Sequence, residues 1–243
     1  DNLKSVSLSA NWMWPCKNDG EDARLYEAVE AISTFACDLG INIPTGKDSL
    51  SMTQKYKNDV VYAPGTVIIT ASGEVSDVRK IVEPVIVNNE NTSLIYIDLS
   101  KEEYKLGGSS FAQVLNKLGT DAPTITDTKY FAKAFNAVQE LIKSGQVLAG
   151  HDISAGGMVT ALLEMTFANS TGGLEINLDS IAEADSIKIL FSENPGLLIQ
   201  VNDTDSIMSI LGNDNIQARI IGRPISGRQL TIKHSGAELN LDI

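Results

Sequence analysis

Segment 149–157 of the sequence, Ala-Gly-His-Asp-Ile-Ser-Ala-Gly-Gly, places a carboxylate, a hydroxyl and three glycines where a predicted strand meets a predicted helix. Ligands collect at such junctions in open α/β sheets, because free backbone N–H groups and the helix dipole favour anions. If the strand continues through them, Asp152 and Ser154 share one side, since side chains alternate along a strand. Asp152 can then hold Mg²⁺, while the Ser154 hydroxyl contacts a phosphate oxygen. Alternatively, both residues only cap the helix and the glycines only form a turn.

Segment 44–52, Pro-Thr-Gly-Lys-Asp-Ser-Leu-Ser-Met, is predicted to be a polar loop with the groups that bind a phosphorylated substrate. Lys47 supplies positive charge, Gly46 allows close approach of the backbone, and Ser49 donates a hydrogen bond. The glycine spacing of a P-loop is missing from this segment. An ordinary solvated hairpin loop is the alternative interpretation.

Two further segments carry weaker signals. Leu-Gly-Gly-Ser-Ser at 106–110 precedes a predicted helix, where it forms either a phosphate-facing N-terminus or a flexible turn with a serine cap. Phe-Ser-Glu-Asn-Pro-Gly at 191–196 ends a predicted helix. Its Glu193 can face the site, although termination of the helix by Pro and Gly accounts for most of the pattern.

For the remaining histidines, the aromatic run at 12–14 and Cys37, the sequence favours a structural role. His151 belongs to no Ser/His/Asp or Cys/His pattern, so we expect a structural histidine. His234 falls in a polar terminal hairpin and is expected to be exposed. The run Trp-Met-Trp at 12–14 is expected to pack in a core or against a partner, with base stacking as the alternative. Cys37 is expected to be a small buried residue late in a helix.

Apolar periodicity predicts the elements that position the Lys47 loop. Alternation over residues 6–10 indicates a strand, and apolar residues at helical spacing from Leu25 to Leu39 indicate a helix that ends at Gly40. Residues 65–75 read as a long, largely buried strand. This first block is therefore expected to be α+β.

A polar stretch at 78–92 precedes a second block, in which strands alternate with helices. We expect domains at residues 1–84 and 93–243, the second with an α/β fold. Its strands are expected at 93–98, 146–150, 173–178, 196–201, 218–221 and 229–233, and its helices at 108–118, 130–143 and 156–169 and near Ser186 and Asp205.

The composition excludes several classes of function. Hydrophobic residues make up 43% of the 243 residues, enough for one large or two modest cores, and the formal net charge is −12. Nucleic acid and anionic membranes are not expected partners, since both require a cationic surface. Cys16 and Cys37 form no metal-binding pattern, and no apolar run is long enough to cross a membrane. We expect a cytoplasmic protein, and the initial Asp leads us to expect a piece of a longer one.

The joint occurrence and order of several segments resemble one protein family. The segments are Leu-Ser-Ala-Asn-Trp-Met at 8–13, Gly-Glu-Asp-Ala-Arg-Leu-Tyr at 20–26, Ile-Pro-Thr-Gly-Lys-Asp-Ser-Leu-Ser-Met at 43–52, Leu-Gly-Gly-Ser at 106–109, Gly-His-Asp-Ile-Ser-Ala-Gly-Gly at 150–157 and Phe-Ser-Glu at 191–193. Over essentially the whole chain, they resemble the second half of the synthetase region of the long-chain formylglycinamidine ribonucleotide synthases. Leu-Gly-Gly-Ser is shared more widely with ATP-using relatives such as aminoimidazole ribonucleotide synthase.

The resemblance implies a fold and a reaction. The fold is the end of an α+β N-terminal domain with a barrel-like sheet, followed by a complete α/β C-terminal domain with a mixed sheet, as in aminoimidazole ribonucleotide synthase. The family is an ATP-dependent carbon–nitrogen ligase of purine biosynthesis. ATP phosphorylates the amide oxygen of formylglycinamide ribonucleotide, and ammonia from glutamine displaces the phosphate, leaving the amidine.

The same resemblance implies roles for five residues: Asp152 is a Mg²⁺ ligand, Ser154 and Gly46 contact ATP or ADP, and Lys47 and Ser49 contact the ribonucleotide. A shorter relative has Asn where this chain has Lys47, which argues against a metal role there. The catalytic histidine region, other metal-binding carboxylates and the glutaminase nucleophile are expected outside this chain. The upstream synthetase domains and the glutaminase domain are therefore the expected partners, and the isolated chain is expected to be inactive.

Two classes of function stay open at this stage. The chain is either an enzyme fragment that completes a substrate site, or a structural module whose bound nucleotide and Mg²⁺ only hold domains together. The long enzymes resemble one another in keeping a non-reacting nucleotide in one of two pseudo-symmetric sites. Another ATP-using relative, such as a selenophosphate synthetase or a hydrogenase-maturation protein, is a third possibility, but it should lack Gly-Lys-Asp-Ser-Leu-Ser-Met.

Overall fold

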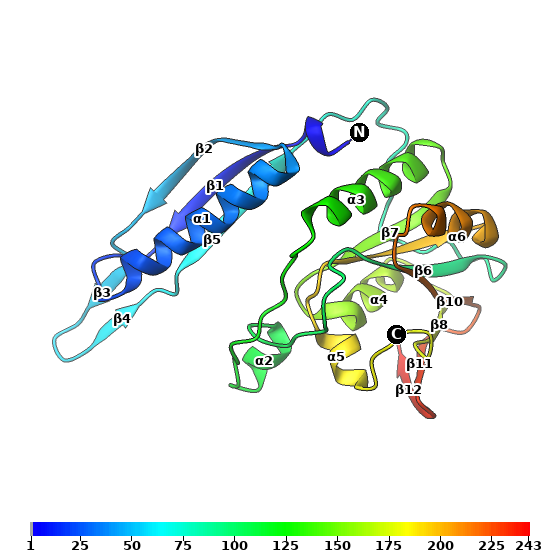
Figure 1. Ribbon diagram of the computed structural model, residues 1–243. Helices are drawn as coiled ribbons and strands as arrows, with labels where there is room; N and C mark the ends of the chain where they lie inside the picture. Colours follow the sequence, from blue (N-terminus) through cyan, green and yellow to red (C-terminus); the bar gives the residue numbers. More distant parts are fainter. Residues whose placement is uncertain (1) are drawn as a thin grey trace. The chain divides into compact units, whose positions relative to one another are not determined.

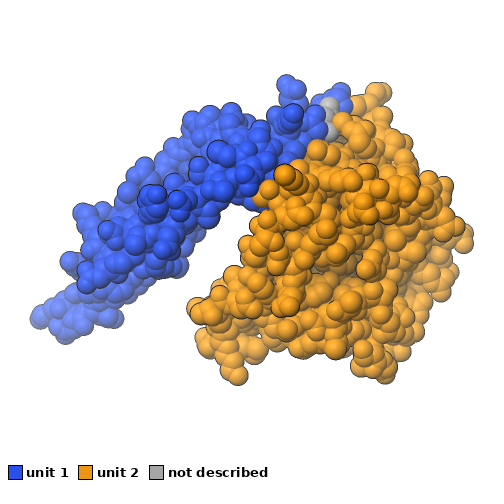
Figure 2. All heavy atoms as spheres, in the orientation of Figure 1, with its two compact units in different colours: residues 1–76 blue, residues 77–243 orange. Residues whose placement is uncertain are grey.

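A computed structural model describes residues 2–243 of the chain. The chain divides into two compact units, unit 1 with residues 1–76 and unit 2 with residues 77–243 (Figure 2). Each unit has its own sheet (Figure 1). Within the described residues, no helix is long and apolar enough to span a membrane.

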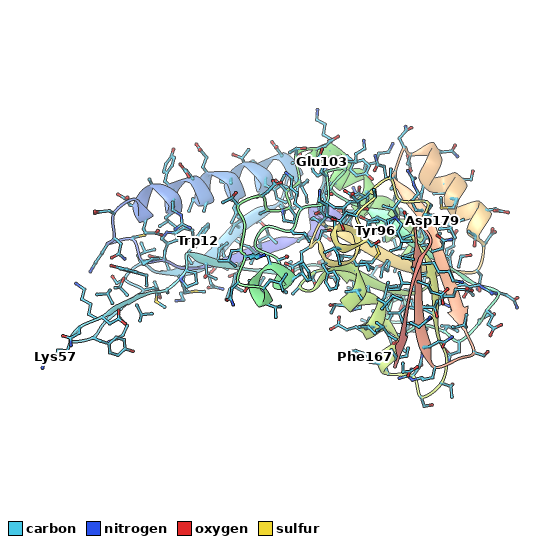
Figure 3. The ribbon with its side chains drawn as sticks, turned by 90° about the horizontal axis from the view of Figure 1, so that it is seen from below. Trp12, Lys57, Tyr96, Glu103, Phe167 and Asp179 are labelled. Atoms are coloured by element: carbon cyan, nitrogen blue, oxygen red, sulfur yellow. The ribbon has the colours of Figure 1, made fainter. Side chains whose placement is uncertain are left out.

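Unit 1 consists of a three-stranded sheet, one long helix and a small hairpin. Its elements are η1 (Leu3–Ser5), β1 (Ser7–Met13), α1 (Glu21–Leu39), β2 (Asn42–Ser49), β3 (Thr53–Lys55), β4 (Val60–Tyr62) and β5 (Thr66–Ser72). The strand order is β2-β1-β5, with β2 parallel and β5 antiparallel to β1. Strands β3 and β4 form the hairpin, with Lys57 at its tip (Figure 3). This arrangement is α+β.

Helix α1 ends where the sequence predicts. Gly40 adopts a left-handed conformation with φ of 68°, and its N–H donates to the last free carbonyls of the helix, which explains the preference for glycine. Ala36 and Leu39 are the buried residues of α1. Cys37 is exposed, so the expectation of a buried cysteine was wrong: it lies beside the buried stripe and not within it.

Two expectations for the sheet of unit 1 need correction. Residues 45–49 are not a loop but the end of β2, because their backbone pairs with β1 from Ser9 to Met13. Strand β5 is not largely buried: Ile68 is 53% exposed and Ile69 is 39% exposed. Strand β5 lies at the edge of this sheet. Its apolar run predicts that both of its faces are buried, but no other part of unit 1 buries Ile68 and Ile69.

Unit 2 is built on a mixed seven-stranded sheet with the order β12-β11-β8-β10-β6-β9-β7. Its strands are β6 (Ser93–Asp98), β7 (Val147–Ile153), β8 (Gly173–Asn177), β9 (Gly196–Val201), β10 (Ala218–Ile225), β11 (Gln229–His234) and β12 (Ala237–Asp242). Its helices are α2 (Ser110–Val114), α3 (Thr128–Lys143), α4 (Gly157–Phe167), α5 (Ser186–Phe191) and α6 (Thr204–Asn213). The predicted α/β class of the second block is confirmed.

Helices cover both faces of this sheet, and strand β6 contributes to both cores. Leu94 and Tyr96 belong to one apolar cluster, which includes residues of α4 and α5. Ile95 and Ile97 belong to the other cluster, which includes residues of α3 and α6. The alternation of side chains along a strand divides these neighbours between the two cores. Burying each such side chain contributes about 1.5–3 kcal/mol.

Two details of unit 2 differ from the sequence-based expectation. Helix α2 is only five residues long, shorter than the predicted 108–118. His234 is buried and not exposed, because its Nδ1 lies 2.7 Å from the Ser186 hydroxyl and ties the end of β11 to the start of α5. The strand that follows, β12, completes the terminal hairpin.

Candidate functional site

Strand β7 delivers Asp152 and Ser154 to the start of α4. The strand runs through Asp152, which pairs with Leu197 of β9, and Ser154 follows directly after the strand. The Asp152 side chain is 70% exposed. Helix α4 has no side-chain cap, so capping does not explain Asp152 or Ser154. Both side chains are exposed at this junction, and Oδ1 of Asp152 lies 3.5 Å from Nδ1 of His151.

Two consecutive glycines turn the chain from β7 into α4. Gly156 and Gly157 have φ of 90° and 76°, values that other residues rarely adopt. A Cβ on Gly157 would lie 2.6 Å from the carbonyl oxygen of Leu190 in α5. Glycine is therefore required here for the backbone conformation and for close packing of α4 against α5.

His151 lies between two oxygen partners. Its Nδ1 is 2.7 Å from the backbone oxygen of Asp152, and its Nε2 is 3.1 Å from a carboxylate oxygen of Glu164 in α4. The ring is mostly buried, with 16% of the side chain exposed. These contacts link the end of β7 to the middle of α4, beside the Asp152 carboxylate.

Glu193 joins two of the glycine-containing segments. Its Oε1 accepts the backbone N–H of Ser110 at 2.7 Å and that of Gly156 at 2.9 Å. The next residue, Asn194, is 2% exposed, accepts the N–H of Lys105 and donates to the Glu103 carbonyl. Segment 191–196 thus connects these segments, and apart from the presence of a glutamate no sequence pattern predicts the contacts.

The Leu-Gly-Gly-Ser segment forms a tight capped turn. The Ser109 hydroxyl accepts the N–H of Ala112, which makes Ser109 the cap of α2. A Cβ on Gly107 would lie 2.5 Å from the backbone of Asp121. The serine cap of the second interpretation is therefore present.

In unit 1, strand β2 separates the predicted site residues onto two faces. Lys47 and Ser49 are two residues apart and share a face, and the Lys47 ammonium donates to the Ser49 hydroxyl at 2.6 Å. Gly46 lies on the opposite face, directly beside Ala10 of β1. A Cβ on Gly46 would lie 1.9 Å from the Ala10 oxygen, so only glycine fits.

The face that carries Lys47 is rich in hydrogen-bonding groups, and we call it the polar face. It is defined by Ser9, Asn11, Thr45, Lys47, Ser49 and Thr70, which the strand register places side by side. Sequence reasoning missed Asn11, because only the register shows that it is the partner of Lys47. Helix α1 contacts the other side, where the Arg24 guanidinium lies 5.6 Å from the centroid of the Trp14 ring.

The described residues contain no group of three or more His, Cys, Asp or Glu side chains that could hold a metal ion. Asp152 is nevertheless a suitable ligand for Mg²⁺, because its exposed carboxylate supplies hard oxygen donors. Mg²⁺ is usually held by one or two carboxylates together with phosphate oxygens and water. The residues present therefore fit a shared metal site better than a complete one.

Comparison with known families defines the class of protein. Residues 93–235 match the family described as AIR synthase related protein, C-terminal domain, so the chain belongs to this family. Residues 1–74 match the FGAR-AT PurM_N-like domain.

Two curated relatives carry the same enzyme name. The chain is 39% identical over 238 residues to a probable phosphoribosylformylglycinamidine synthase, chloroplastic/mitochondrial, of Arabidopsis thaliana, covering 96% of this chain and 17% of the relative. It is 37% identical over 235 residues to a probable phosphoribosylformylglycinamidine synthase of Caenorhabditis elegans, covering 91% of this chain and 18% of the relative. The resemblance seen in the sequence is confirmed. The chain spans less than a fifth of the length of these relatives.

Solved structures share the fold. PurL of Thermotoga maritima complexed with FGAR matches with a TM-score of 0.72 and 15% identity, over 99% of this chain and 39% of that one. The same protein complexed with ATP matches with a TM-score of 0.70 and 13% identity, over 99% and 37%. E. coli HypE, a hydrogenase maturation protein, matches with a TM-score of 0.66 and 18% identity, over 97% and 72%.

Proposed function

We propose that this chain is part of an ATP-dependent ligase that converts formylglycinamide ribonucleotide, glutamine and ATP to formylglycinamidine ribonucleotide, glutamate, ADP and phosphate. The names of the two curated relatives support this proposal. The structural observation that carries it is the exposed Asp152 and Ser154 pair at the end of β7, which has no capping role.

In this proposal, Asp152 holds Mg²⁺ and Ser154 contacts the nucleotide, ATP or ADP. Support comes from the solved complexes of Thermotoga maritima PurL with ATP, with AMPPCP and with ADP, which share the fold. The bound metal would neutralise phosphate charge beside Asp152. Further metal ligands come from the nucleotide or from segments outside this chain. On unit 1 taken by itself, Gly46 is proposed to offer its main chain to a nucleotide at the free edge of β2.

The polar face of unit 1 is the proposed binding surface for the ribonucleotide substrate. The Lys47 ammonium supplies the positive charge for a phosphate group, and the Ser49 hydroxyl both accepts from Lys47 and can donate to the ligand. This chain has a formal net charge of −12, so a local cation is required where an anionic substrate binds.

The reaction needs groups that this chain does not supply. Phosphorylation of the substrate amide and release of ammonia from glutamine require the upstream synthetase domains and the glutaminase domain of a longer synthase, which are the proposed partners. The role of this chain is to bind and orient nucleotide and substrate. The isolated chain is therefore proposed to have no turnover, and the complete protein is proposed to act in the cytoplasm.

Calorimetric titration with ADP and ATP, with and without Mg²⁺, tests the nucleotide site. We expect Mg²⁺-dependent binding to the chain that is lost in Asp152→Ala and retained in Asp179→Ala, a variant at another exposed aspartate of unit 2. Equal binding by the Asp152→Ala variant would refute the assignment of Asp152.

The alternative function is a structural nucleotide module of the same enzyme. A Ser49→Ala change in the full-length protein separates the two functions. A raised KM for the ribonucleotide supports a substrate site, whereas unchanged kinetics combined with Mg²⁺-dependent nucleotide binding supports the structural module.

A further inference from the structure

We propose that Glu193 is a positioning residue, whose carboxylate acts as an internal anion and holds the Asp152–Gly157 loop and the start of α2 in one arrangement. The functional consequence of this inference rests on the proposed nucleotide site. The hydrogen bonds of Glu193 on which the inference is based are independent of that site, because they lie entirely within unit 2.

A single oxygen of Glu193 accepts two backbone N–H groups from distant parts of the chain. Ser110 is 83 residues away and Gly156 is 37 residues away in sequence. Both groups lie at the starts of helices, where no preceding turn offers an acceptor. A carboxylate is favoured there, because charge-assisted hydrogen bonds are stronger than neutral ones and the helix dipole attracts negative charge. Glu193 thus takes the place that a phosphate occupies at other glycine-rich loops.

The segment that carries Glu193 is anchored on both sides. Before it, the Phe191 ring packs against Phe111 of α2, with centroids 4.6 Å apart. After it, the Asn194 amide is buried and bonded to the chain around Lys105. Because the carboxylate is held at a fixed place, its two hydrogen bonds fix the loops and are not merely a response to them.

The position of Ser154 and Asp152 follows from that of Gly156. Gly156 comes two residues after Ser154 and four after Asp152, on the same turn into α4. A shift of the Gly156 backbone would therefore move both proposed ligand-binding side chains. Glu193 touches neither nucleotide nor metal in this proposal, and it acts only through the loop.

Chemical rescue tests this inference. In the 243-residue chain, Glu193→Ala leaves two N–H groups open, and formate has the carboxylate that can fill the space. Amide hydrogen exchange at Ser110 and Gly156 and the thermal midpoint are measured in sodium formate and in sodium chloride at equal ionic strength. The matched control is Glu103→Ala, which removes an exposed glutamate carboxylate of unit 2 (Figure 3).

We expect Glu193→Ala to raise the exchange rates at Ser110 and Gly156 together, by about tenfold or more. Formate should reverse most of this rise and restore the midpoint in Glu193→Ala, and it should do neither in Glu103→Ala. Glu193→Gln keeps an uncharged acceptor of the same size, so its rates should be intermediate. This variant also provides the measurement if Glu193→Ala does not fold.

Unchanged exchange in Glu193→Ala, a change at only one of the two amides, or an equal effect of formate on the control would overturn the inference. The affinity for Mg²⁺ and ADP, measured on the same variants, separates it from the proposed function. If the unaltered chain binds no nucleotide while formate rescues Glu193→Ala, the proposed nucleotide site fails and the role of Glu193 in the loop stands.

Discussion

Asn11 of β1 and Lys47 of β2 are direct register partners on adjacent parallel strands. Their side chains therefore emerge on the same face, next to the Ser49 hydroxyl that accepts from Lys47. On the other side of Asn11 lies Ile68 of β5, whose side chain has no polar atom. If the polar face binds the ribonucleotide as proposed, the Asn11 amide is a hydrogen-bonding group for it.

Replacing Asn11 with leucine, which is similar in size but apolar, tests this relationship in the full-length enzyme. We expect KM for the ribonucleotide to rise about threefold to tenfold with little change in kcat, because a binding hydrogen bond is lost. Asn58→Leu in the β3–β4 turn is the control. Steady-state kinetics with varied ribonucleotide provides the measurement, and an unchanged KM would remove Asn11 from the site.

Removing the charge of Lys47 should weaken substrate binding more strongly. Lys47→Met keeps most of the length of the side chain, and we expect KM for the ribonucleotide to rise about tenfold or more. The effect should shrink at high salt, because the interaction is between charges. Lys57→Met, at the tip of the hairpin in Figure 3, is the matched loss of charge. An equal rise in KM in the two variants would show that substrate binding depends on net charge and not on the position of Lys47.

The glycine at the start of α4 should be irreplaceable. In Gly157→Ala, the left-handed conformation and the contact with the Leu190 oxygen together should cost at least about 2 kcal/mol of unfolding free energy. Gly145→Ala is the control, since Gly145 has φ of 72° but no atom within 4 Å of an added Cβ. It should lose only about 1 kcal/mol. Urea unfolding measures the free energy of unfolding of both variants. Equal losses of this free energy would exclude a contribution from the steric contact with the Leu190 oxygen.

An ion pair between β8 and β11 should make stability depend on pH. A hydrogen bond from Lys233, with Nζ 3.0 Å from Oε1, holds the pKa of Glu175 below its usual range. The stabilisation is therefore present above the ordinary pKa of glutamate and is lost as pH falls through the lowered value. At neutral pH, the urea concentration at the unfolding midpoint should be slightly lower for Glu175→Gln than for the unaltered chain. In strong acid, the two midpoints should be equal. A difference that persists in acid would contradict the assignment.

The sequence was most informative where one segment determines its own structure. Helix α1 and its end at Gly40 follow from apolar spacing and a left-handed glycine, and β6 follows from a short apolar run. Segment 45–49 was misassigned because its side chains are polar, whereas its conformation is set by backbone pairing with β1. The pairing partner of each of these residues lies 36 residues earlier, and local patterns carry no information about it.

The contacts around the candidate sites could not be predicted for the same reason. The sequence indicated Asp152 and Ser154 from their place between a strand and a helix. It did not indicate that Glu193 bonds to Ser110 and Gly156, because three separate segments must first meet in the folded chain. His234 was misjudged on similar grounds, since its partner Ser186 lies 48 residues earlier.

The position of strand β6 between the two cores affects how unit 2 unfolds. Its consecutive residues Leu94, Ile95, Tyr96 and Ile97 are divided between the two apolar clusters. Loss of β6 from the sheet would therefore disrupt both clusters at once. The two layers of helices should therefore be lost in one cooperative transition. The amide protons of β6 should exchange with solvent only through complete unfolding of unit 2, and they would report its full stability.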